Sequence, residues 1–443
     1  MGSRVSRPLR RDALEILRGA LTDTSPLRLL PSLLSFESGI FSGPDFKIRL
    51  HPARKMLVLG MGKAAGSMAR ALLTLVPSKD LEGLMVVPGR GSKVGGVRSI
   101  RGSHPIPDGR SFRAGRALLR RVESAAPGDL VIHLISGGAS ALAALPLVPL
   151  VTEPEKSLLH RLLVRSGLGI HEINVVRKHF SAIKGGRLLA HAPRARHLSI
   201  LLSDVPRDCP ETIGGGPTLP DPSTWGECLE ILKRSGIQNE LPRAMVARIG
   251  RRKWPETPKP SDRIFRNHVW TVLGDSMTLV EAARRHARAL GYATRVLPGS
   301  VEGTAESLLD SFCRAREGWM SPASAPRCLI GGGEVRVRTP SSRGRGGRAQ
   351  DLAAAAALRM RARGSWLFLA AGSDGRDGNS PAAGALADGG TFARARRLGL
   401  NLEELRETGN TYELFHRLGD SLITGPTGNN LRDLYLWLET AAR

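Results

Sequence analysis

The chain contains few of the features that build disulfide frameworks, structural zinc sites or membrane spans. Its four cysteines lie far apart in 443 residues and form no C-x-x-C pair, so neither a zinc site nor a disulfide scaffold is expected. No apolar run approaches the roughly 20 residues that a membrane helix needs. The basic N-terminus is not followed by the apolar segment of a secretory signal. We therefore expect a protein without a membrane segment in a reducing, cytoplasmic compartment.

Aromatic and acidic residues are also scarce. Aromatics make up 4% of the chain, so Leu, Val, Ile and Ala must fill the cores that a 41% hydrophobic composition supports. Lysine and arginine number 65 against 40 acidic residues, a formal net charge of +25. Such an excess can indicate a nucleic-acid surface, but the arginines are scattered and few aromatics stand beside them for base stacking. We interpret the charge as a general basic composition that also attracts anionic substrates.

A short apolar strand, a polar or glycine-rich turn and a helix follow one another repeatedly along the chain. Examples are MLVLG-MGK from Met56, LVIHLI-SGGAS from Leu130, LSILL-SDV from Leu198, CLI-GGGE from Cys328 and WLFLAA-GSDG from Trp366. This alternation predicts parallel α/β sheets whose turns at the carboxyl ends of strands gather at one edge, where ligands bind. A Pro-rich stretch at 251–262 predicts a boundary between a domain of residues 1–250 and a domain of residues 262–443.

The first of these turns, Gly60 to Ala65, has the G-x-G-x-x-G/A spacing of a dinucleotide-binding turn. It also contains Lys63, whose ammonium group would suit a phosphate. Two hypotheses therefore stay open, a redox dinucleotide or an anion held by a lysine. In the redox hypothesis the second strand, 84–87, should end in an acidic residue for the ribose. It ends in Pro88-Gly89-Arg90 instead, where only Arg90 would suit NADP.

Several later turns combine glycine with cationic or hydroxyl side chains. The segment 136–140, SGGAS, could form an anion nest or simply a tight turn into a helix. The segment 174–187 brings Arg177 and the Lys184-Gly185-Gly186 turn together, either as phosphate ligands or as a solvated basic helix end. Among the histidines, only His179 of this segment is a plausible site residue. A further turn, GRGGR at 344–348, suits bidentate recognition of a phosphate or carboxylate.

Carboxylates follow three other strands. Asp204 ends one strand, Glu334 ends another, and the turn 372–378 carries Asp374 and Asp377. Such groups could position Mg²⁺ or accept a proton. The alternative is that they are helix caps and turn residues.

Taken in order, these motifs resemble the class II glycerate 2-kinases. The matching strings are GMGKAA, SHPIPDGRS, LISGGAS, INVVRKHFSAIKGGRL, LLSDVP, GGGPTLPDP, GGGE, GRGGRAQD, AAGSDGRDGNSPAAGALADG and ITGPTGNNLRDL. The resemblance extends from about Asp12 to the C-terminus. It implies a Rossmann-like parallel-sheet N-terminal domain, a second α/β domain of the MOFRL type, and an active site in the interdomain cleft.

The resemblance also implies an activity and its cofactors. These are ATP- and Mg²⁺-dependent phosphorylation of the C2 hydroxyl of D-glycerate, giving 2-phosphoglycerate. The alternative is an NAD(P)H-dependent hydroxypyruvate reductase, a label that some relatives carry. The partners expected are D-glycerate and ATP, with neither membrane nor nucleic acid, and a homodimer is compatible with the resemblance.

Carried over by position, the resemblance implies three groups of site residues. The catalytic group is Lys63, Arg348 and Asp204; the substrate and nucleotide group is Gly62, Ser136, Gly137, Gly138, Ser140, Arg177, Lys184, Gly185, Gly186, Glu334 and Asn430; the metal group is Asp204, Asp374 and Asp377. Arg348 is expected in an exposed loop. Several positions depart from the family pattern, among them Ala139 in place of glycine, Ala349 in place of asparagine and Asn410 in place of aspartate. Ala139 would strain its turn if that position needs a positive φ.

Overall fold

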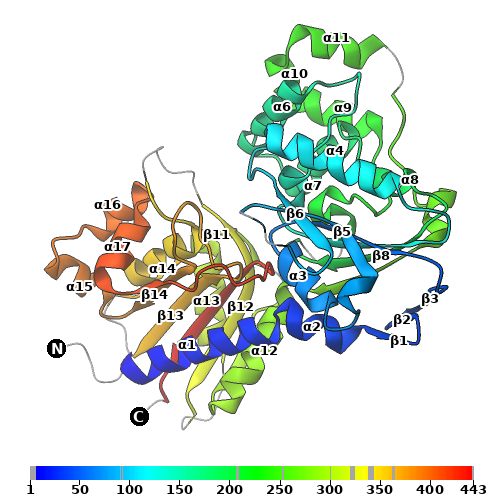
Figure 1. Ribbon diagram of the computed structural model, residues 1–443. Coiled ribbons are helices and arrows are strands. Elements are labelled where there is room, and N and C mark those ends of the chain that lie inside the picture. Colours follow the sequence, from blue (N-terminus) through cyan, green and yellow to red (C-terminus); the bar gives the residue numbers. More distant parts are fainter. Residues whose placement is uncertain are drawn as a thin grey trace. The chain divides into compact units, whose positions relative to one another are not determined.

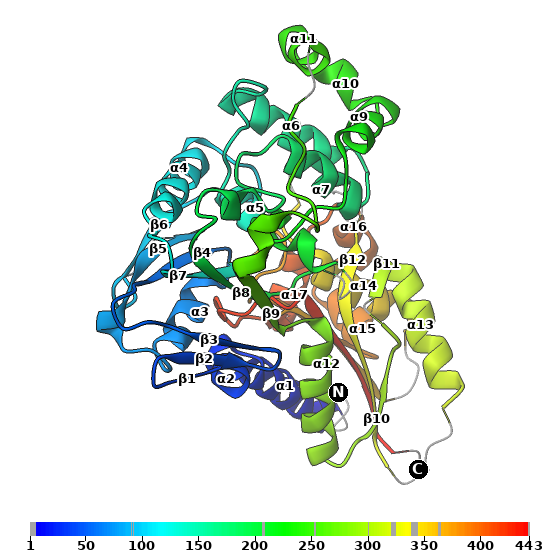
Figure 2. The same cartoon turned by 90° about the vertical axis from the view of Figure 1, so that its right-hand side faces the viewer.

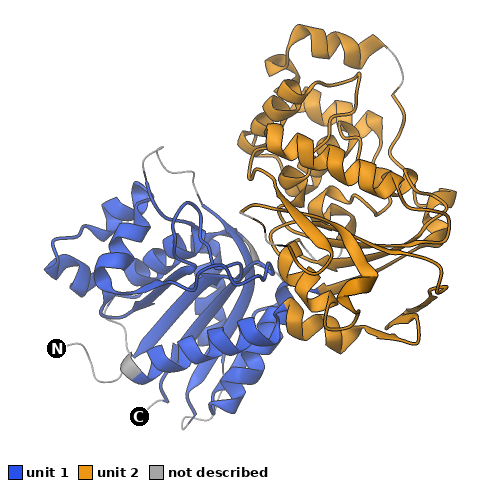
Figure 3. Cartoon of the chain, viewed as in Figure 1, with its two compact units in different colours: residues 1–25, 274–443 blue, residues 26–273 orange. Residues whose placement is uncertain are grey.

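The fold is described from a computed structural model for residues 6–89, 91, 93–205, 209–251, 254–299, 301–319, 325–337, 344–361 and 365–441. The chain forms two compact units (Figure 3). Unit 1 comprises residues 1–25 and 274–443, and unit 2 comprises residues 26–273. No helix of the described residues has the length and apolarity needed to cross a bilayer.

Unit 2 is built on a six-stranded sheet with the order β6-β5-β4-β7-β8-β9. Its strands are β4 (Met56–Met61), β5 (Leu81–Val87), β6 (Val97–Arg101), β7 (Leu130–Ser136), β8 (Arg196–Leu202) and β9 (His268–Gly274). The strands from β6 to β8 pair in parallel. Because β5 and β6 extend the sheet on one side of β4, and β7 and β8 on the other, the strand order reverses between β4 and β7. In doubly wound sheets ligands bind at this reversal.

The central strands of unit 2 are buried along their whole length, as the continuous apolar runs predict. Every residue of β4 and of β7 is buried, which is typical of parallel strands covered by helices on both faces. Helices α3 (Ala65–Leu72) and α4 (Gly109–Glu123) pack on this sheet. Asp108 caps α4 by accepting from the backbone N–H of Arg110 at 2.9 Å. The predicted parallel α/β sheet is confirmed for this unit.

A separate helical group completes unit 2. It consists of α6 (Glu153–Arg165), α7 (Ile170–His179), α9 (Trp225–Arg234), α10 (Ile237–Glu240) and α11 (Arg243–Arg251), which lie together in Figures 1 and 2. These helices share a core of their own that includes Phe180 and Trp225. The remaining elements are α2 (Pro26–Leu33), α5 (Ala139–Leu142), α8 (Arg187–Ala190), the 3₁₀ segments 78–80, 210–215 and 263–267, and an antiparallel meander of β1 (Ser35–Glu37), β2 (Ile40–Gly43) and β3 (Phe46–Arg49).

Unit 1 contains a seven-stranded sheet with the order β10-β12-β16-β13-β14-β15, and β11 also pairs with β12. Its strands are β10 (Ala293–Val296), β11 (Val301–Thr304), β12 (Arg327–Arg336), β13 (Trp366–Gly372), β14 (Gly384–Asp388), β15 (Ser421–Leu422) and β16 (Asp433–Glu439). The sheet is mixed, whereas the alternation of strands and helices predicted a parallel one. The reason is that β16 returns from the end of the chain and runs antiparallel between β12 and β13.

Helices cover both faces of this mixed sheet. On one side α13 (Ala305–Glu317) and α14 (Arg348–Arg359) share a core with alternate strand residues such as Phe368, Tyr435 and Trp437. Helices α1 (Ser6–Asp23) and α12 (Ser276–Ala289) pack together and against β16. The other helices are α15 (Thr391–Arg397), α16 (Leu402–Glu407) and α17 (Thr411–Leu418).

The compact units do not divide where the sequence pattern placed the domain boundary. The Pro-rich stretch belongs to unit 2, because Pro258 O accepts from Asp221 N at 2.9 Å and Thr257 Oγ1 donates to Asp221 at 2.9 Å. Helix α1 belongs to unit 1 instead, where Asp23 contacts His286 Nε2 of α12 at 3.1 Å. A linear break near residue 250 cannot describe this exchange, since the N-terminal helix packs on a sheet formed late in the chain.

Candidate functional site

The turns that follow β4 and β7 are in direct contact at the reversal of strand order. Lys63 N donates to Gly137 O at 3.0 Å, and Ala64 N donates to Ser136 Oγ at 3.0 Å. Gly62 has φ +126°, and a Cβ there would lie 2.2 Å from Ser136 Oγ. The second glycine is therefore required by the close approach of the two turns, which brings Lys63 next to the SGGAS segment.

These contacts use the donors that a dinucleotide would need. In a dinucleotide-binding turn the backbone N–H groups at the start of the helix face the pyrophosphate. Here Gly62 N donates to Val86 O at 3.2 Å, and the next two N–H groups donate to the β7 turn. The geometry disfavours the redox hypothesis for this turn and leaves Lys63 as its charged group. Arg90, the residue that would suit NADP, lies outside the described residues.

The SGGAS segment is unstrained despite its alanine. Gly138 takes the left-handed conformation, with φ +83°, and Ala139 is the first residue of α5. A Cβ on Gly138 would lie 3.3 Å from Lys63 Cγ and 3.3 Å from the His104 ring. The side chains of Lys63 and His104 thus flank the turn, and the glycine that this geometry requires is Gly138 rather than the residue after it.

Beside this turn, Lys184 lies buried with only 1% of its surface exposed. Its ammonium group donates to Gly214 O at 3.3 Å and to Ala143 O at 3.4 Å. A Cβ on Gly215 would lie 2.8 Å from Lys184 Cδ, so the glycine makes room for the lysine stem. Burial, and then the charge of Arg177, lowers the pKa of Lys184 to about 7.

The two glycines after Lys184 pack against protein. Gly185 N donates to Gly215 O at 3.1 Å, and Gly186 N donates to Gly216 O at 2.8 Å. Their predicted role as phosphate-binding donors is disfavoured, because both N–H groups already have acceptors. The charge of this turn is on the side chain of Lys184, and the backbone N–H groups that follow it are satisfied within the protein.

His179, the plausible site histidine of the sequence analysis, lies in the core of the helical group. Its Nδ1 contacts Val175 O at 2.8 Å, and its ring packs edge-on against Trp225. The neighbouring Lys178 forms an ion pair with Asp221 at 3.2 Å. His160 is also buried, and burial and then the charges of Arg177 and other cations hold its pKa well below the ordinary value. A histidine in the middle of an amphipathic helix gave no sequence signal.

In unit 1, Arg348 is the first residue of α14 and forms ion pairs with Glu334 and Asp433. Its Nε donates to Asp433 Oδ2 at 2.7 Å and its Nη2 to Oδ1 at 3.2 Å. Burial opposes the charge of Arg348, but Asp433 and Glu334 more than offset it and raise the pKa. The expectation of an exposed loop residue is wrong, since the side chain is 34% exposed and its carboxylate partner 2%.

Asp433 is a partner of Arg348 that the sequence analysis did not single out. The sheet register sets it opposite both Gly333 and Gly372, because β16 runs between β12 and β13. It therefore starts its strand at the edge where β13 ends, whereas β12 continues to Arg336, so Glu334 lies within β12 rather than after it. Sequence reasoning looked for polar residues after strands, and an antiparallel strand brings its first residue to that edge instead.

Asp377 holds the start of α14. Its Oδ1 accepts from Ala349 N at 3.1 Å, and its Oδ2 accepts from Gln350 N at 2.9 Å and from Gln350 Nε2 at 2.9 Å. Burial, and then the charge of Asp433, raises the pKa of Asp377 to about 6. A carboxylate occupied in this way is better suited to fixing Arg348 than to binding Mg²⁺, which was its predicted role.

The other predicted carboxylates lie near the ends of their strands. Asp374 Oδ1 accepts from Arg376 N at 3.0 Å, and a Cβ on Gly372 would be 3.5 Å from it and 3.4 Å from Asp433. Asp204 is half-buried two residues after β8 in unit 2. Asn430 is buried in unit 1. The described residues contain no ready-made group of three or more His, Cys, Asp or Glu ligands around one point.

The chain matches two family models and several known proteins. A domain of unknown function, DUF4147, matches residues 12–250, and the MOFRL family matches residues 327–433. Glycerate 2-kinase from Pyrococcus horikoshii is 32% identical over 99% of both chains. A putative hydroxypyruvate reductase from Agrobacterium vitis is 34% identical over 86% of this chain and 87% of its own. The crystal structure of glycerate kinase from Thermotoga maritima has a TM-score of 0.78 at 29% identity, covering 97% of this chain and 99% of that one.

The chain belongs to the class II glycerate 2-kinase family. Its departures from the family pattern have structural explanations. Ala349 is the second residue of α14 and is fully buried in the core of unit 1. Asn410 Oδ1 accepts from Arg345 N at 3.3 Å and so restrains the glycine loop before Arg348. Neither position adds a charge beside Arg348.

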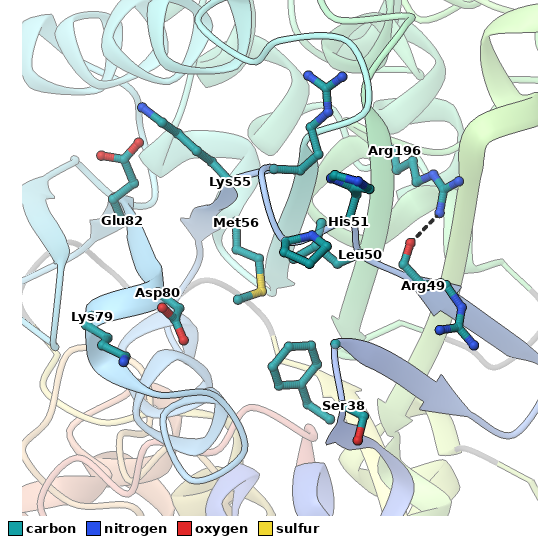
Figure 4. Close-up of a pocket in the computed structure, with 14 residues that line it drawn as sticks. Ser38, Arg49, Leu50, His51, Lys55, Met56, Lys79, Asp80, Glu82 and Arg196 are labelled. Carbon is teal, nitrogen blue, oxygen red and sulfur yellow. Dashed lines mark hydrogen bonds between the residues drawn. The ribbon is translucent and has the colours of Figure 1, made fainter.

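One cavity in the described part of the chain lies away from these turns (Figure 4). It has a volume of about 950 Å³ and is lined by Phe36, Met56, Lys79 and Arg196 among others. Met56 begins β4 and Arg196 begins β8, so the cavity is at the amino ends of the parallel strands. Lys63 and the SGGAS turn are at the carboxyl ends.

Proposed function

We propose that this protein transfers the γ-phosphoryl group of ATP to the C2 hydroxyl of D-glycerate, giving 2-phosphoglycerate. The observation that carries the proposal is the contact between the turns after β4 and β7. The backbone N–H groups of the first turn donate to the second turn, and the side chain of Lys63 lies beside the SGGAS segment. The full-length relative from Pyrococcus horikoshii is named a glycerate 2-kinase, which supplies the substrate class.

Phosphoryl transfer depends on positioning and on neutralising charge. We assign Lys63 of unit 2 and Arg348 of unit 1 to the γ-phosphoryl group or the glycerate carboxylate. The SGGAS segment, with Gly62, is assigned to phosphate oxygens. The location of the active site between the two domains stays a prediction, as does a homodimer.

Carboxylates are assigned two kinds of role. Asp204 and Asp374 would hold Mg²⁺, since carboxylate oxygens are its preferred protein ligands, and the ion would neutralise phosphate charge when bound with the nucleotide. Asp204 is also assigned to accept the hydroxyl proton, and Glu334 and Asn430 to orient substrate. The free cysteines of the described chain fit a reducing compartment, and the cytoplasmic location is part of the proposal.

The test is to incubate the protein with Mg-ATP and D-glycerate and to identify the phosphoglycerate isomer by NMR. We expect glycerate-dependent ADP release and the 2-phospho isomer. A 3-phospho product would refute the assigned position. Oxidation of NADH or NADPH with hydroxypyruvate, without ADP release, would instead establish the reductase alternative, a name that the Agrobacterium vitis relative carries.

A matched pair of lysine variants tests the site itself. Lys63 follows β4, whereas Lys55 immediately precedes it and lines the distant cavity. Lys63→Met should lower kcat/KM on the order of 10²-fold or more, as the loss of a charge-stabilising group does. Lys55→Met should leave it unchanged. Equal effects of the two changes would remove the strand reversal from the mechanism.

A further inference from the structure

Unit 2 contains two buried lysines and a partly buried arginine that have no acidic partner among the described residues. We call Lys156, Arg177 and Lys184 the cation cluster. Lys156 and Lys184 are 2% and 1% exposed, and Arg177 is partly exposed. Across the described residues, no carboxylate forms an ion pair with any of the three. Buried lysines and arginines in proteins are normally paired, because an isolated charge is costly to remove from water.

The lysines of the cluster are held by backbone carbonyl groups alone. Lys156 Nζ donates to Phe180 O at 2.9 Å and to Arg177 O at 3.2 Å, while Lys184 Nζ donates to Gly214 O and Ala143 O. Neutral carbonyl groups orient an ammonium group but do not cancel its charge. Accordingly, burial and then the neighbouring cations Lys184 and Arg177 hold the pKa of Lys156 well below its ordinary value.

Two neighbours show that unpaired cations are not general in this region. Lys178 follows Arg177 directly, is only 3% exposed, and pairs with Asp221. Arg187 donates to three backbone carbonyls and also lies in the fields of Asp221 and Glu256. Asp221 and Glu256 therefore lie near Lys178 and Arg187, and the cation cluster is left with net positive charge.

Unused donors lie in the same region. Arg177 Nε and Ser140 Oγ are both buried without a hydrogen-bond partner among the described residues. Ser140 belongs to α5, and Ala143, whose carbonyl accepts from Lys184, directly follows that helix. The cluster is thus adjacent to the SGGAS turn that contacts Lys63. Buried polar groups in folded proteins nearly always have partners, so orphaned donors beside uncompensated charge indicate a missing acceptor.

We infer that the cation cluster, with Ser140, is an internal binding site for a phosphoryl dianion. A compact group with two negative charges and several acceptor oxygens would neutralise the cluster and accept from the orphaned donors. The inference rests on the proposed kinase function for the identity of the anion. It adds Lys156 to the binding residues and states that unit 2 is incompletely neutralised until the phosphoryl group is bound.

The experiment is thermal unfolding of the full chain in sodium phosphate against sodium chloride at matched ionic strength and pH 6.5. Phosphate should raise the Tm of the wild-type protein saturably, by about 2–4 °C. Lys184→Met should remove this response while leaving the Tm in chloride equal to or above that of the wild type. The matched control is Lys178→Met, which should lower the Tm in chloride because Asp221 is left unpaired, but should retain the response to phosphate.

Each outcome decides the inference. A wild-type protein that does not respond to phosphate, or a Lys184→Met protein that responds fully, would overturn it. If Lys184→Met does not fold, Arg177→Met is measured in the same way. Titration with ADP and with 2-phosphoglycerate then distinguishes which molecule carries the phosphoryl group. A phosphate response without kinase activity would refute the proposed function alone, and kinase activity without the response would refute the inference alone.

Discussion

Arg348 in unit 1 and Lys184 in unit 2 are both cations withdrawn from water, but only Arg348 has acidic partners. Glu334 and Asp433 neutralise Arg348 and direct its guanidinium group. Lys184 has carbonyl partners and cationic neighbours. A self-neutralised cation is preorganised and costs little stability, whereas an uncompensated one is costly until an anion arrives. The comparison indicates that unit 1 holds an oriented guanidinium group, whereas unit 2 holds positive charge that would attract an anion.

The largest expected effect comes from Arg348→Lys. Lysine keeps the charge but cannot donate to Asp433 through two nitrogens. We expect kcat/KM with D-glycerate to fall on the order of 10²-fold or more, about 2.7 kcal/mol. Because Asp433 is buried, unfolding free energy should fall by about 1–3 kcal/mol rather than by the few tenths typical of an exposed loop. Steady-state kinetics measure kcat/KM, and urea unfolding measures the free energy of unfolding. Unchanged kinetics in a folded variant would show that the orientation of the guanidinium group does not matter.

The next largest effect is expected from Asp377→Asn, which tests whether Asp377 orients the side chain of Arg348. The amide cannot accept from all the donors at the start of α14, so Arg348 should be misplaced. We expect kcat to fall on the order of tenfold, since small misplacements in an active site carry penalties of this size. The Mg²⁺ dependence should not change. Asp374→Asn is the comparison, because it should raise the Mg²⁺ concentration needed for half-maximal activity.

If both aspartate variants shift the Mg²⁺ dependence equally, Asp377 is a metal-binding residue after all and the positioning role is wrong. Rescue of kcat by Asp377→Glu would not be expected, because the longer side chain does not fit against Gly347. A Cβ on Gly347 would already lie 2.2 Å from Asp377 Oδ1.

A third prediction concerns the pH dependence that an uncompensated lysine creates. The pKa of Lys184 is about 7 in the folded protein against an ordinary 10.5. Between these values the unfolded chain binds more protons, so stability due to this residue rises with pH, by up to about 1.4 kcal/mol per pH unit. Urea unfolding should show Lys184→Met to be the more stable protein at pH 6.5. Its advantage should shrink as the pH rises from 7 to 9. A constant difference would mean that Lys184 does not titrate in this range.

The smallest expected effect is that of Ala139→Gly, which restores the family residue. Gly138 already provides the left-handed conformation, and Ala139 begins a helical turn. The change should cost about 0.5–1 kcal/mol of stability, as glycine does in a helix, and leave kcat/KM within about twofold. A tenfold gain in activity would show that the alanine reshapes the anion site.

Much of the fold and part of the site could be predicted from local pattern. The apolar runs at 56–61 and 130–136 form the buried strands expected of them. The glycines after each run marked the turn that carries Lys63. These features depend on neighbours in the chain, so periodicity and turn chemistry suffice to reveal them.

The contacts of the charged residues depended on segments that are distant in the sequence. Asp433 meets Arg348 because β16 inserts antiparallel between two parallel strands. Lys156 and His160 lie on a helix that looks solvated in sequence, and their burial follows from packing against α7 and the segment after it. Helix α1 likewise belongs to unit 1 because it packs against α12, which lies more than 250 residues further along the chain.

The sequence by itself determined where strands, turns and charged motifs occur, and through its motif order the family to which the chain belongs. It also determined that Lys63 and Arg348 follow glycine turns, because glycine is the residue that such backbone approaches require. Only the tertiary structure decided which charges are neutralised. A buried cation is neutralised only when an acid lies close to it in space, and that acid can be far away in the sequence. Asp433, which pairs with Arg348, is 85 residues further along the chain. The ammonium group of Lys184 contacts only carbonyl groups.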